Sequence, residues 1–376
     1  MLKILIPLMD VNELEEAVDL EGILLEPYKE GVDAVCNPSV FQDSQEGPWP
    51  FLYRCIKRGG DSVINLRQLE SPVQLSEEYR TIIWPAEDYE SGGCEDPGLA
   101  KVEGVWYIPY VGWDKKNARI CLATTTDFKE IKKWGVIGPQ IPIKEGIDLV
   151  PNIYKRGLEG YLKGVKELGA DLKKVFVWDK DPVIEYNPLI KKWVLIHRID
   201  PHAHIAVVDS LDELIGERGG EYWREHFKNL DKHVFLKNQE PWENEKVGFA
   251  CFAQLGDKKV GIYHGVNDKL EYCVGICEVD PDSYVVVSKL RDPVLRPDGD
   301  IFVFRYKDDG GQEKEKRVIF SKGSIVDERT RRCYIYSGLA DTRIGFRSIN
   351  IDWIYKELNH PHNRLSEEKL APVLSS

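Results

Sequence analysis

Short segments that alternate apolar and polar residues recur along the chain. The clearest read VWYIPYVGW, KWVLIHRI, KKVGIYHGV and RCYIYSGLA. Each is followed by a polar loop and a second segment of the same kind: ARICLATTTD, HIAVVDS, YCVGICEVD and TRIGFRSIN. Alternation with period two predicts β-strands that bury one face. The pattern therefore predicts the same β-hairpin four times, and FLYRCIKRGGDSVINLRQL reads as an earlier, weaker copy.

An aromatic ring recurs at one position of these five hairpins. The equivalent residues are Tyr53, Tyr110, His197, Tyr263 and Tyr336. Their spacing exceeds the period of about 40–50 residues of WD and kelch repeats, which leaves room for larger loops between repeats. We therefore predict an all-β fold, a five-bladed β-propeller. A β-sandwich also contains hairpins, but it gives no reason for one kind of residue to recur at the same place in each copy.

One segment departs from the strand pattern. GLEGYLKGVKELGADLKK, which begins at Gly157, spaces its apolar residues as a helix does, although internal glycines weaken it. We predict a helical insertion at about residues 140–175, before the third blade of a single propeller domain that spans residues 1–352. Residues 353–376 are predicted to form a partly helical tail, and the first residues a closing strand for the last blade. The insertion packs on the side of the propeller, mediates contact in a homo-oligomer, or, most simply, is a surface helix without a special role.

The composition narrows the choice of partners and compartment. The net charge is −12 without a run of Lys or Arg, which argues against a nucleic-acid partner. An aromatic content of 10% suits sheets or a sugar site. No apolar stretch is long enough for a membrane span, and the first residues lack the features of a secretion signal. The eight cysteines contain no CxxC pair and lie mostly in strand-like runs, so we expect reduced thiols in a cytoplasmic protein.

Two adjacent acids, Glu95 and Asp96, stand directly before Pro97 and the second hairpin. A solvated turn explains this arrangement, and so does a catalytic carboxylate at the mouth of a sheet. On an extended segment, neighbouring side chains point to opposite faces, so one of the two acids is expected to face a central cavity. A carboxylic acid with a raised pKa can protonate the leaving oxygen of a glycosidic bond.

The segment CEDPGLAKVEGVWYIPYVGWDKKNARICLATTTDF resembles the second blade of glycoside hydrolase family 130, the β-mannoside phosphorylases and their hydrolytic relatives. NPSVF and LYR resemble the first blade, WDKDPVI to LIHRI the third, IYHGV and RDPVLRP the fourth, and YSGLADTRIG the fifth. The resemblance covers most of residues 30–350 and implies a five-bladed propeller. The chain departs from the family at Gly98, where the family has Arg, and in KDPVIEY and GFACFAQ, so it resembles a divergent member.

The resemblance implies roles for individual residues. Asp96 is the proton donor, and its proton travels through a sugar hydroxyl. The family's phosphorylases carry basic residues at the positions of Arg119, Lys180 and His197, and Arg198 stands beside His197, so we expect these four to bind phosphate. A surface ion pair is the simpler explanation for any one of these basic residues taken alone. The prediction of a phosphate site depends on their occurring together at positions that match the family. Sugar contacts are expected from Asn37, Arg54, Asn117, Asp181, Tyr263, His264 and Asp341, with Trp113 as a stacking surface.

The stretch HRIDPHAH places His202 and His204 on one face of a strand, which is half of a zinc site. No further ligand follows at the required spacing, and the resembled family uses no metal. We therefore expect no metal and no cofactor, with inorganic phosphate as a co-substrate.

We predict an enzyme that cleaves a β-mannoside, such as a small oligosaccharide, by inverting phosphorolysis and gives α-mannose 1-phosphate. Two alternatives stay open: a β-mannosidase of the same fold, which uses water, and a non-catalytic sugar-binding propeller. A β-furanosidase is a third option, but it needs three carboxylates on separate blades, which the sequence does not place convincingly.

Overall fold

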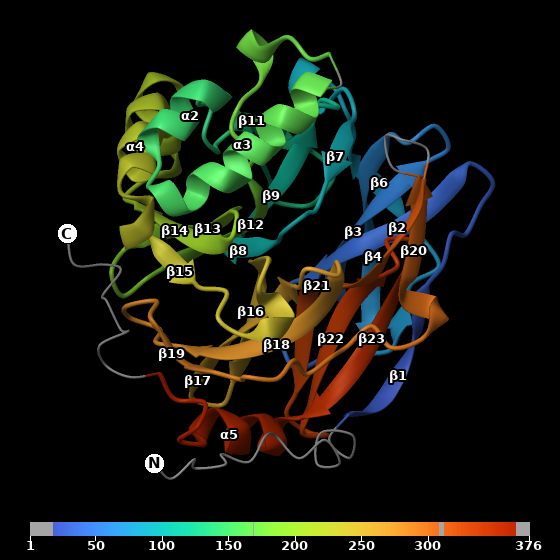
Figure 1. The fold of residues 1–376 in the computed structure, drawn as a ribbon. Helices are drawn as coiled ribbons and strands as arrows, with labels where there is room; N and C mark the ends of the chain where they lie inside the picture. The colour runs from blue at the N-terminus through green and yellow to red at the C-terminus, as the bar shows by residue number, and fades with distance from the viewer. Residues whose placement is uncertain (1–17, 168, 308–311, 366–376) are drawn as a thin grey trace.

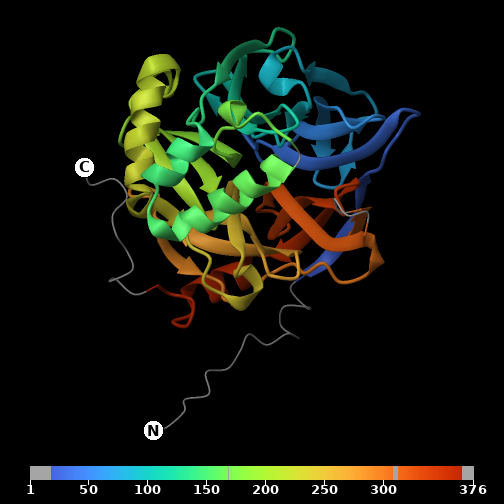
Figure 2. The same ribbon diagram turned by 45° about the horizontal axis from the view of Figure 1, so that its top comes forward.

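Antiparallel sheets dominate the computed structural model, which describes residues 18–167, 169–307 and 312–365. The remaining residues, which include parts of the predicted domain 1–352 and of the predicted tail 353–376, lie outside the described part. In that part, five antiparallel units follow one another along the chain. Figure 2 shows them in chain order around a common centre, from blue through green and orange to red.

Each unit is built around four antiparallel strands, most of which are joined by short loops; the connection from β14 to β15 in unit 3 is a helical segment, and the last strand of unit 5 comes from the start of the chain. Unit 1 consists of β2 (Val32–Val40), β3 (Trp49–Lys57), β4 (Ser62–Ser71) and β6 (Arg80–Ile83), with β5 (Gln74–Leu75) beside β4. Unit 2 consists of β7 (Gly93–Glu95) and β8 (Ala100–Val102), both paired with β9 (Val105–Trp113), then β10 (Ala118–Thr125) and β11 (Lys132–Val136). Unit 3 consists of β12 (Lys180–Asn187), β13 (Lys192–Ile199), β14 (His202–Val208) and β15 (Val234–Leu236).

The last two units follow the same plan. Unit 4 consists of β16 (Lys246–Leu255), β17 (Lys258–Val266), β18 (Glu271–Val279) and β19 (Val286–Lys289). Unit 5 consists of β21 (Glu313–Asp327), β22 (Arg332–Leu339), β23 (Arg343–Asn350) and β1 (Val18–Leu25), with β20 (Val303–Lys307) beside the start of β21. The expected closing strand is therefore confirmed: β1 comes from the start of the chain and pairs with β23 (Figure 1).

The recurring aromatic position lies on the second strand of every unit. Its five members have no exposed surface at all: Tyr53 on β3, Tyr110 on β9, His197 on β13, Tyr263 on β17 and Tyr336 on β22. These second strands are buried on both faces over most of their length, so the expectation that each strand buries one face is wrong, because each unit packs against a neighbour on both sides.

Hydrophobic cores lie between neighbouring units and close on themselves. Separate clusters of buried side chains join units 1 and 2, units 2 and 3, units 3 and 4, and units 4 and 5. A further cluster joins unit 5 back to unit 1 through Phe51 and Tyr336, whose rings meet edge to face with centroids 5.6 Å apart. Each unit is therefore held by apolar contacts on two sides.

The first strand of each unit is interrupted at an equivalent place. In units 1, 2 and 3 the interruption is an Asn-Pro or Asp-Pro pair whose first residue has a left-handed backbone: φ is 48° at Asn37, 49° at Asp96 and 56° at Asp181. In units 4 and 5 the strand register shifts at Ala250 and Lys322. We call these five positions the bends. A left-handed Asn or Asp is uncommon and often marks a functional position.

Helices cover the side of unit 3. Helices α2 (Ile143–Leu149) and α3 (Asn152–Glu167) and the short helix η2 (Leu172–Lys174) lie between β11 and β12, inside the predicted insertion at 140–175. Helix α3 starts five residues before the predicted Gly157, and it buries Tyr154, Leu158 and Val165. Figure 1 shows α2, α3 and α4 gathered above the strands of unit 3.

Two further helices pack against the strands. Helix α4 (Gly216–Lys228) lies between β14 and β15 and was not predicted, since GERGGEYWREHFK has few apolar residues; it buries Trp223 and Phe227. Helix α5 (Ile351–Asn359) follows β23 and buries Ile351, Ile354 and Leu358 against units 4 and 5.

Two features of the described residues bear on the environment of the protein. The helices found there are too short or too polar to cross a bilayer. All eight cysteines are free thiols, and each except Cys251 is buried.

Candidate active site

The bends of units 2 and 3 place two acids in the interior of the molecule. Asp96 is 4% exposed and Asp181 is 1% exposed. Each is followed by a proline and comes from a different unit, so the fold brings together residues that are distant in the sequence.

Glu95 and Asp96 share their cationic partners. Lys180 Nζ lies 3.4 Å from Oε2 of Glu95 and 4.0 Å from Oδ2 of Asp96. Arg54 donates a hydrogen bond to Glu95 and lies 3.8 Å from Oδ1 of Asp96. The prediction that the two acids point to opposite faces is therefore wrong. It assumed an extended backbone, whereas the left-handed φ of Asp96 turns both carboxylates toward the same two cations.

The environment separates the pKa values of the two acids. Burial raises the pKa of Asp96, and the nearby charge of Glu95 raises it further, while Lys180 and Arg54 oppose this. Burial also disfavours the ionised form of Glu95, but Lys180 and Arg54 outweigh it and hold its pKa below the usual value. The pKa values of these two neighbouring carboxyl groups shift in opposite directions. This suits a general acid, Asp96, that keeps its proton beside an ionised Glu95.

One carboxyl oxygen of Asp96 lacks a hydrogen-bond donor in the described part of the chain. Its Oδ1 atom is buried and accepts no hydrogen bond from the described residues. A buried carboxyl oxygen without a donor is costly unless a ligand or water supplies one.

The same ion cluster continues around Asp181, whose charge is close enough to raise the pKa of Asp96. Arg198 Nη1 lies 3.0 Å from Oδ2 of Asp181, and His264 Nε2 lies 3.4 Å from the same oxygen. Burial disfavours the charged form, but Arg198 and His264 outweigh it and hold the pKa of Asp181 far below its usual range. Asp181 is therefore an ionised carboxylate, in contrast to Asp96.

The structure brings together most of the predicted site residues. Asp341 at the turn after β22 is close enough to raise the pKa of Arg54, and it forms a 2.8 Å ion pair with Lys316. Asn37 is buried at the bend of unit 1. The predicted residues in or beside this ion cluster are Arg54, Asp96, Lys180, Asp181, Arg198, His264 and Asp341.

His197 does not join the ion cluster. Its Nδ1 lies 3.0 Å from Oδ2 of Asp179, and its Nε2 lies 3.1 Å from Nε2 of His226 on α4. Neighbouring residues on a strand face opposite ways, so Arg198 faces Asp181 while His197 takes the place that buried tyrosines hold in the other units. This position corrects the expectation that both residues lie with Asp96.

Three other predicted residues also have structural partners. Arg119 pairs with Asp114 at 3.2 Å and lies over the ring of Phe176. The Asn117 side chain bonds the backbone of Lys174 and Phe176, which ties the β9–β10 loop to the end of the insertion. Tyr263 is fully buried and stacks on Trp242, so it does not reach the ion cluster.

An aromatic group borders Lys180. The Nζ atom of Lys180 lies 4.9 Å from the ring centre of Trp178. Trp178 in turn contacts Trp113 at 5.5 Å and Tyr161 of α3 at 5.2 Å between ring centres. Trp178 was not predicted as a site residue, although its place two positions before Lys180 in WDKD is a usable signal.

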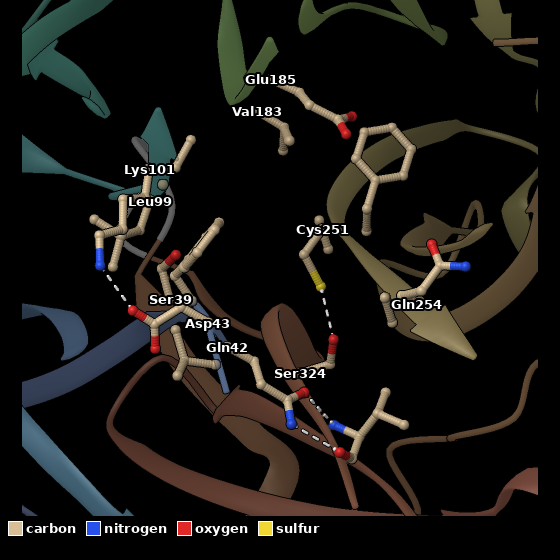
Figure 3. Close-up of a pocket in the computed structure, with 18 of the residues that line it drawn as sticks. Ser39, Gln42, Asp43, Leu99, Lys101, Val183, Glu185, Cys251, Gln254 and Ser324 are labelled. Carbon is tan, nitrogen blue, oxygen red and sulfur yellow. Dashed lines mark hydrogen bonds and ion pairs between the residues drawn. The ribbon is translucent and has the colours of Figure 1, made fainter. Parts of the chain in front are cut away.

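A cavity of about 650 Å³ lies on the other side of the bends (Figure 3). It is lined by residues that follow the bends, among them Ser39, Leu99, Val183, Cys251 and Ser324, and neither Asp96 nor Asp181 lines it. The two acids therefore lie outside this cavity, whereas the bend residues Ala250 and Lys322 line it.

The described residues contain no group of three or more His, Cys, Asp or Glu side chains able to hold a metal ion. His202 and His204 lie beside Tyr154 of α3.

Comparison with known proteins identifies the family. The sequence profile of glycoside hydrolase family 130, described as β-1,4-mannooligosaccharide phosphorylase, matches residues 7–359. The chain belongs to glycoside hydrolase family 130. A family 130 member is a carbohydrate-active enzyme, a phosphorylase or a glycosidase.

The similarity to individual family 130 proteins is distant. The 1,2-β-oligomannan phosphorylase of Thermoanaerobacter sp. (strain X514) is 26% identical over 318 residues, which cover 81% of this chain and 83% of that protein. The β-1,2-mannobiose phosphorylase of Listeria innocua, solved with β-1,2-mannobiose, has a TM-score of 0.60 at 16% identity and covers 89% of this chain and 96% of its own. A structure from work on family 130 hydrolases that target β-1,2 mannosidic linkages in Candida mannan has a TM-score of 0.58 at 15% identity, with 94% of both chains covered.

Proposed function

We propose that the five units are the blades of a five-bladed β-propeller and that the protein cleaves β-mannosides by inverting phosphorolysis. The ring of cores, in which unit 5 packs back on unit 1, supports the propeller. The fold shared with family 130 structures supports it as well.

In the proposed reaction, Asp96 is the acid. The glycosidic C1–O bond breaks, and the proton of Asp96, relayed by a sugar hydroxyl, ends on the leaving oxygen. A phosphate oxygen forms the new bond to C1 from the opposite face, which gives α-mannose 1-phosphate and a shortened acceptor. The observation that carries the proposal is the buried Asp96 between Lys180 and Arg54, with a pKa raised by burial and by Glu95.

The cations near the acid suit phosphate. Lys180 and Arg198 lie with the acids, and Arg119 lies beyond the aromatic group at the edge of the insertion. Arg forks and a Lys point charge are the usual phosphate ligands of proteins. We propose that Lys180, Arg198 and Arg119 bind phosphate, while Asn37, Arg54, His264 and Asp341 contact the sugar.

Hydrolysis is the second candidate. Asp181 is an ionised carboxylate in the same cluster as Asp96, and an inverting hydrolase needs such a base to activate water. The cations of the cluster are also already paired with carboxylates, which weakens the case for a free phosphate site.

One assay separates the candidates. Purified protein is incubated with β-1,2-mannobiose or β-1,4-mannobiose, with and without inorganic phosphate, and the products are resolved by chromatography. Phosphorolysis predicts mannose 1-phosphate, formed only when phosphate is present. Free mannose as the sole product without phosphate would establish hydrolysis instead. The Asp96→Asn variant should lose at least about 1,000-fold in kcat for either reaction, whereas the exposed control Asp209→Asn should match the wild type. Binding of mannobiose without turnover would point to a sugar-binding propeller.

We further propose that the enzyme works in the cytoplasm. Its eight unpaired cysteine thiols suit a reducing compartment.

A further inference from the structure

Lys322 is a charged residue at the bend of unit 5. It lies on β21, where the register with β22 shifts between Ser321 and Gly323, and its exposed fraction is 2%. Its position in unit 5 is equivalent to those of Asp96 and Asp181 in units 2 and 3. Three of the five bends therefore carry charged side chains: two acids and one lysine.

The ammonium group of Lys322 is anchored on a neighbouring bend. Its Nζ donates a 2.9 Å hydrogen bond to the carbonyl oxygen of Pro182, the residue after Asp181. Within the described part of the chain, no carboxylate oxygen lies within ion-pair distance of this nitrogen. The buried Lys289 differs, because the carboxylate of Glu243 neutralises it directly. A buried lysine without a paired carboxylate is costly, which points to a role other than stability.

Gly98 makes room for this contact. A Cβ atom at Gly98 would lie 3.1 Å from the carbonyl oxygen of Pro182 and 2.8 Å from Cγ of Pro109. Both Gly98 and Lys322 line the cavity beyond the bends. The glycine and the ammonium thus converge on one carbonyl, at the boundary between the ion cluster and the cavity shown in Figure 3.

We propose that Lys322 is a positioning residue: anchored on Pro182 through the space left by Gly98, it fixes the bend that carries Asp181 and adds a positive charge beside the acids Asp181 and Asp96. The inference rests on the proposed role of Asp96 as the acid. Lys322 acts through the two acids and not through contact with substrate.

The charges around Asp96 define what Lys322 adds. The charged groups that interact electrostatically with Asp96 come from β3, β7, β12, β13 and β21, and they are Arg54, Glu95, Lys180, Asp181, Arg198 and Lys322; the thiol of Cys36 on β2 also interacts with it. Burial lowers the pKa of Lys322, while Asp181 and Asp96 oppose that change. Removal of this ammonium takes a positive charge from beside Asp96, so the pKa of Asp96 should rise.

Two measurements test the proposal, and the first does not depend on activity. Thermal stability is measured for Gly98→Ala, Lys322→Met and the double variant. If Gly98 and Lys322 meet at Pro182, Gly98→Ala should lower Tm in the wild type. The same substitution should lower Tm by less in the Lys322→Met background, where the carbonyl group of Pro182 can shift. Lys322→Met alone should keep or raise Tm, because it removes a buried charge. Additive Tm changes would overturn the shared anchor, even for a protein that turns over no mannoside.

The second measurement is the pH profile of kcat/KM on the mannoside that the wild type cleaves. Lys322→Met should lose about tenfold or more in kcat/KM, and its alkaline limb should move to higher pH, because Asp96 must be protonated to act. The control Lys289→Met should have a lower Tm, and the alkaline limb of its kcat/KM profile should not move. An unmoved limb in Lys322→Met would overturn the electrostatic role. If the wild type lacks turnover on all mannosides, the proposed function fails, and the coupling in Tm still decides the anchor.

Discussion

Nε2 of His197 lies 3.1 Å from Nε2 of His226, between β13 and α4, where neither ring has access to solvent beyond 3%. Nδ1 of His197 lies 3.0 Å from Oδ2 of the Asp179 carboxylate, so the His197 ring stands between Asp179 and His226. The two histidines therefore join helix α4 to the sheet of unit 3.

The first prediction concerns His197. His197→Phe should lower the free energy of unfolding by about 2–3 kcal/mol, because Asp179 and His226 lose their buried partner. The KM for phosphate should stay within about twofold of the wild type, because His197 does not reach Asp96. Urea denaturation and phosphate titration measure the two quantities. A large rise in KM with unchanged stability would return His197 to the phosphate site.

The second prediction concerns acid stability. Burial lowers the pKa of His202 to about 4 and lowers the pKa values of His204 and His226 well below the usual value. These rings stay neutral in the folded protein but take up protons in the unfolded chain below about pH 6.5. Their contribution to stability is therefore complete above about pH 6.5 and is lost progressively as the pH falls toward 4.

Each such ring should steepen the loss by up to about 1.4 kcal/mol per pH unit. Urea midpoints measured between pH 7.5 and 5 should fall, and His226→Phe should flatten the slope. An unchanged slope in that variant would show that His226 is not held neutral.

The third prediction concerns Glu95. Its charge raises the pKa of Asp96, and it also holds Lys180 and Arg54. Glu95→Gln should lower the pKa of Asp96, so the alkaline limb of kcat/KM should move to lower pH, the opposite of the shift expected for Lys322→Met. The comparison uses one substrate and one buffer series. A limb that moves upward would mean that Glu95 does not act on Asp96 through its charge.

The fourth prediction concerns Trp178. Its ring lies under the Lys180 ammonium, and such a contact contributes about 0.5–2 kcal/mol. Trp178→Ala should raise the KM for phosphate by about 2- to 30-fold, and Trp178→Phe should recover part of the loss. The exposed Trp84 provides the control, since Trp84→Ala should leave phosphate binding unchanged.

The strands were predictable from short apolar runs between polar turns, which repeat along the chain. Burial of both strand faces was not predictable, because it comes from contacts with the two neighbouring units. The aromatic recurrence also contained the correct position of His197. As the counterpart of Tyr53 and Tyr110, His197 is expected in a buried core position. The family resemblance instead implies that His197 binds phosphate. Helix α4 was missed because it buries a few large rings, such as Trp223, within a polar segment.

The site was predicted less well where backbone geometry decided it. An extended backbone would point Glu95 and Asp96 to opposite faces, and no residue pattern in the sequence indicates that Asp96 has a left-handed backbone. Lys322 carried a weak signal, since SKGSI in unit 5 aligns with KDPVI in unit 3, but its anchor on Pro182 depends on contacts between units that sequence periodicity does not reveal.

The pairing of β1 with β23 has a consequence for biosynthesis. Residues 18–25 are synthesised long before their hydrogen-bond partners at 343–350. Strand β1 therefore stays unpaired until β23 has been translated. Ring closure is then a late event, and a nascent chain halted before β23 should be easily digested by proteases near its beginning.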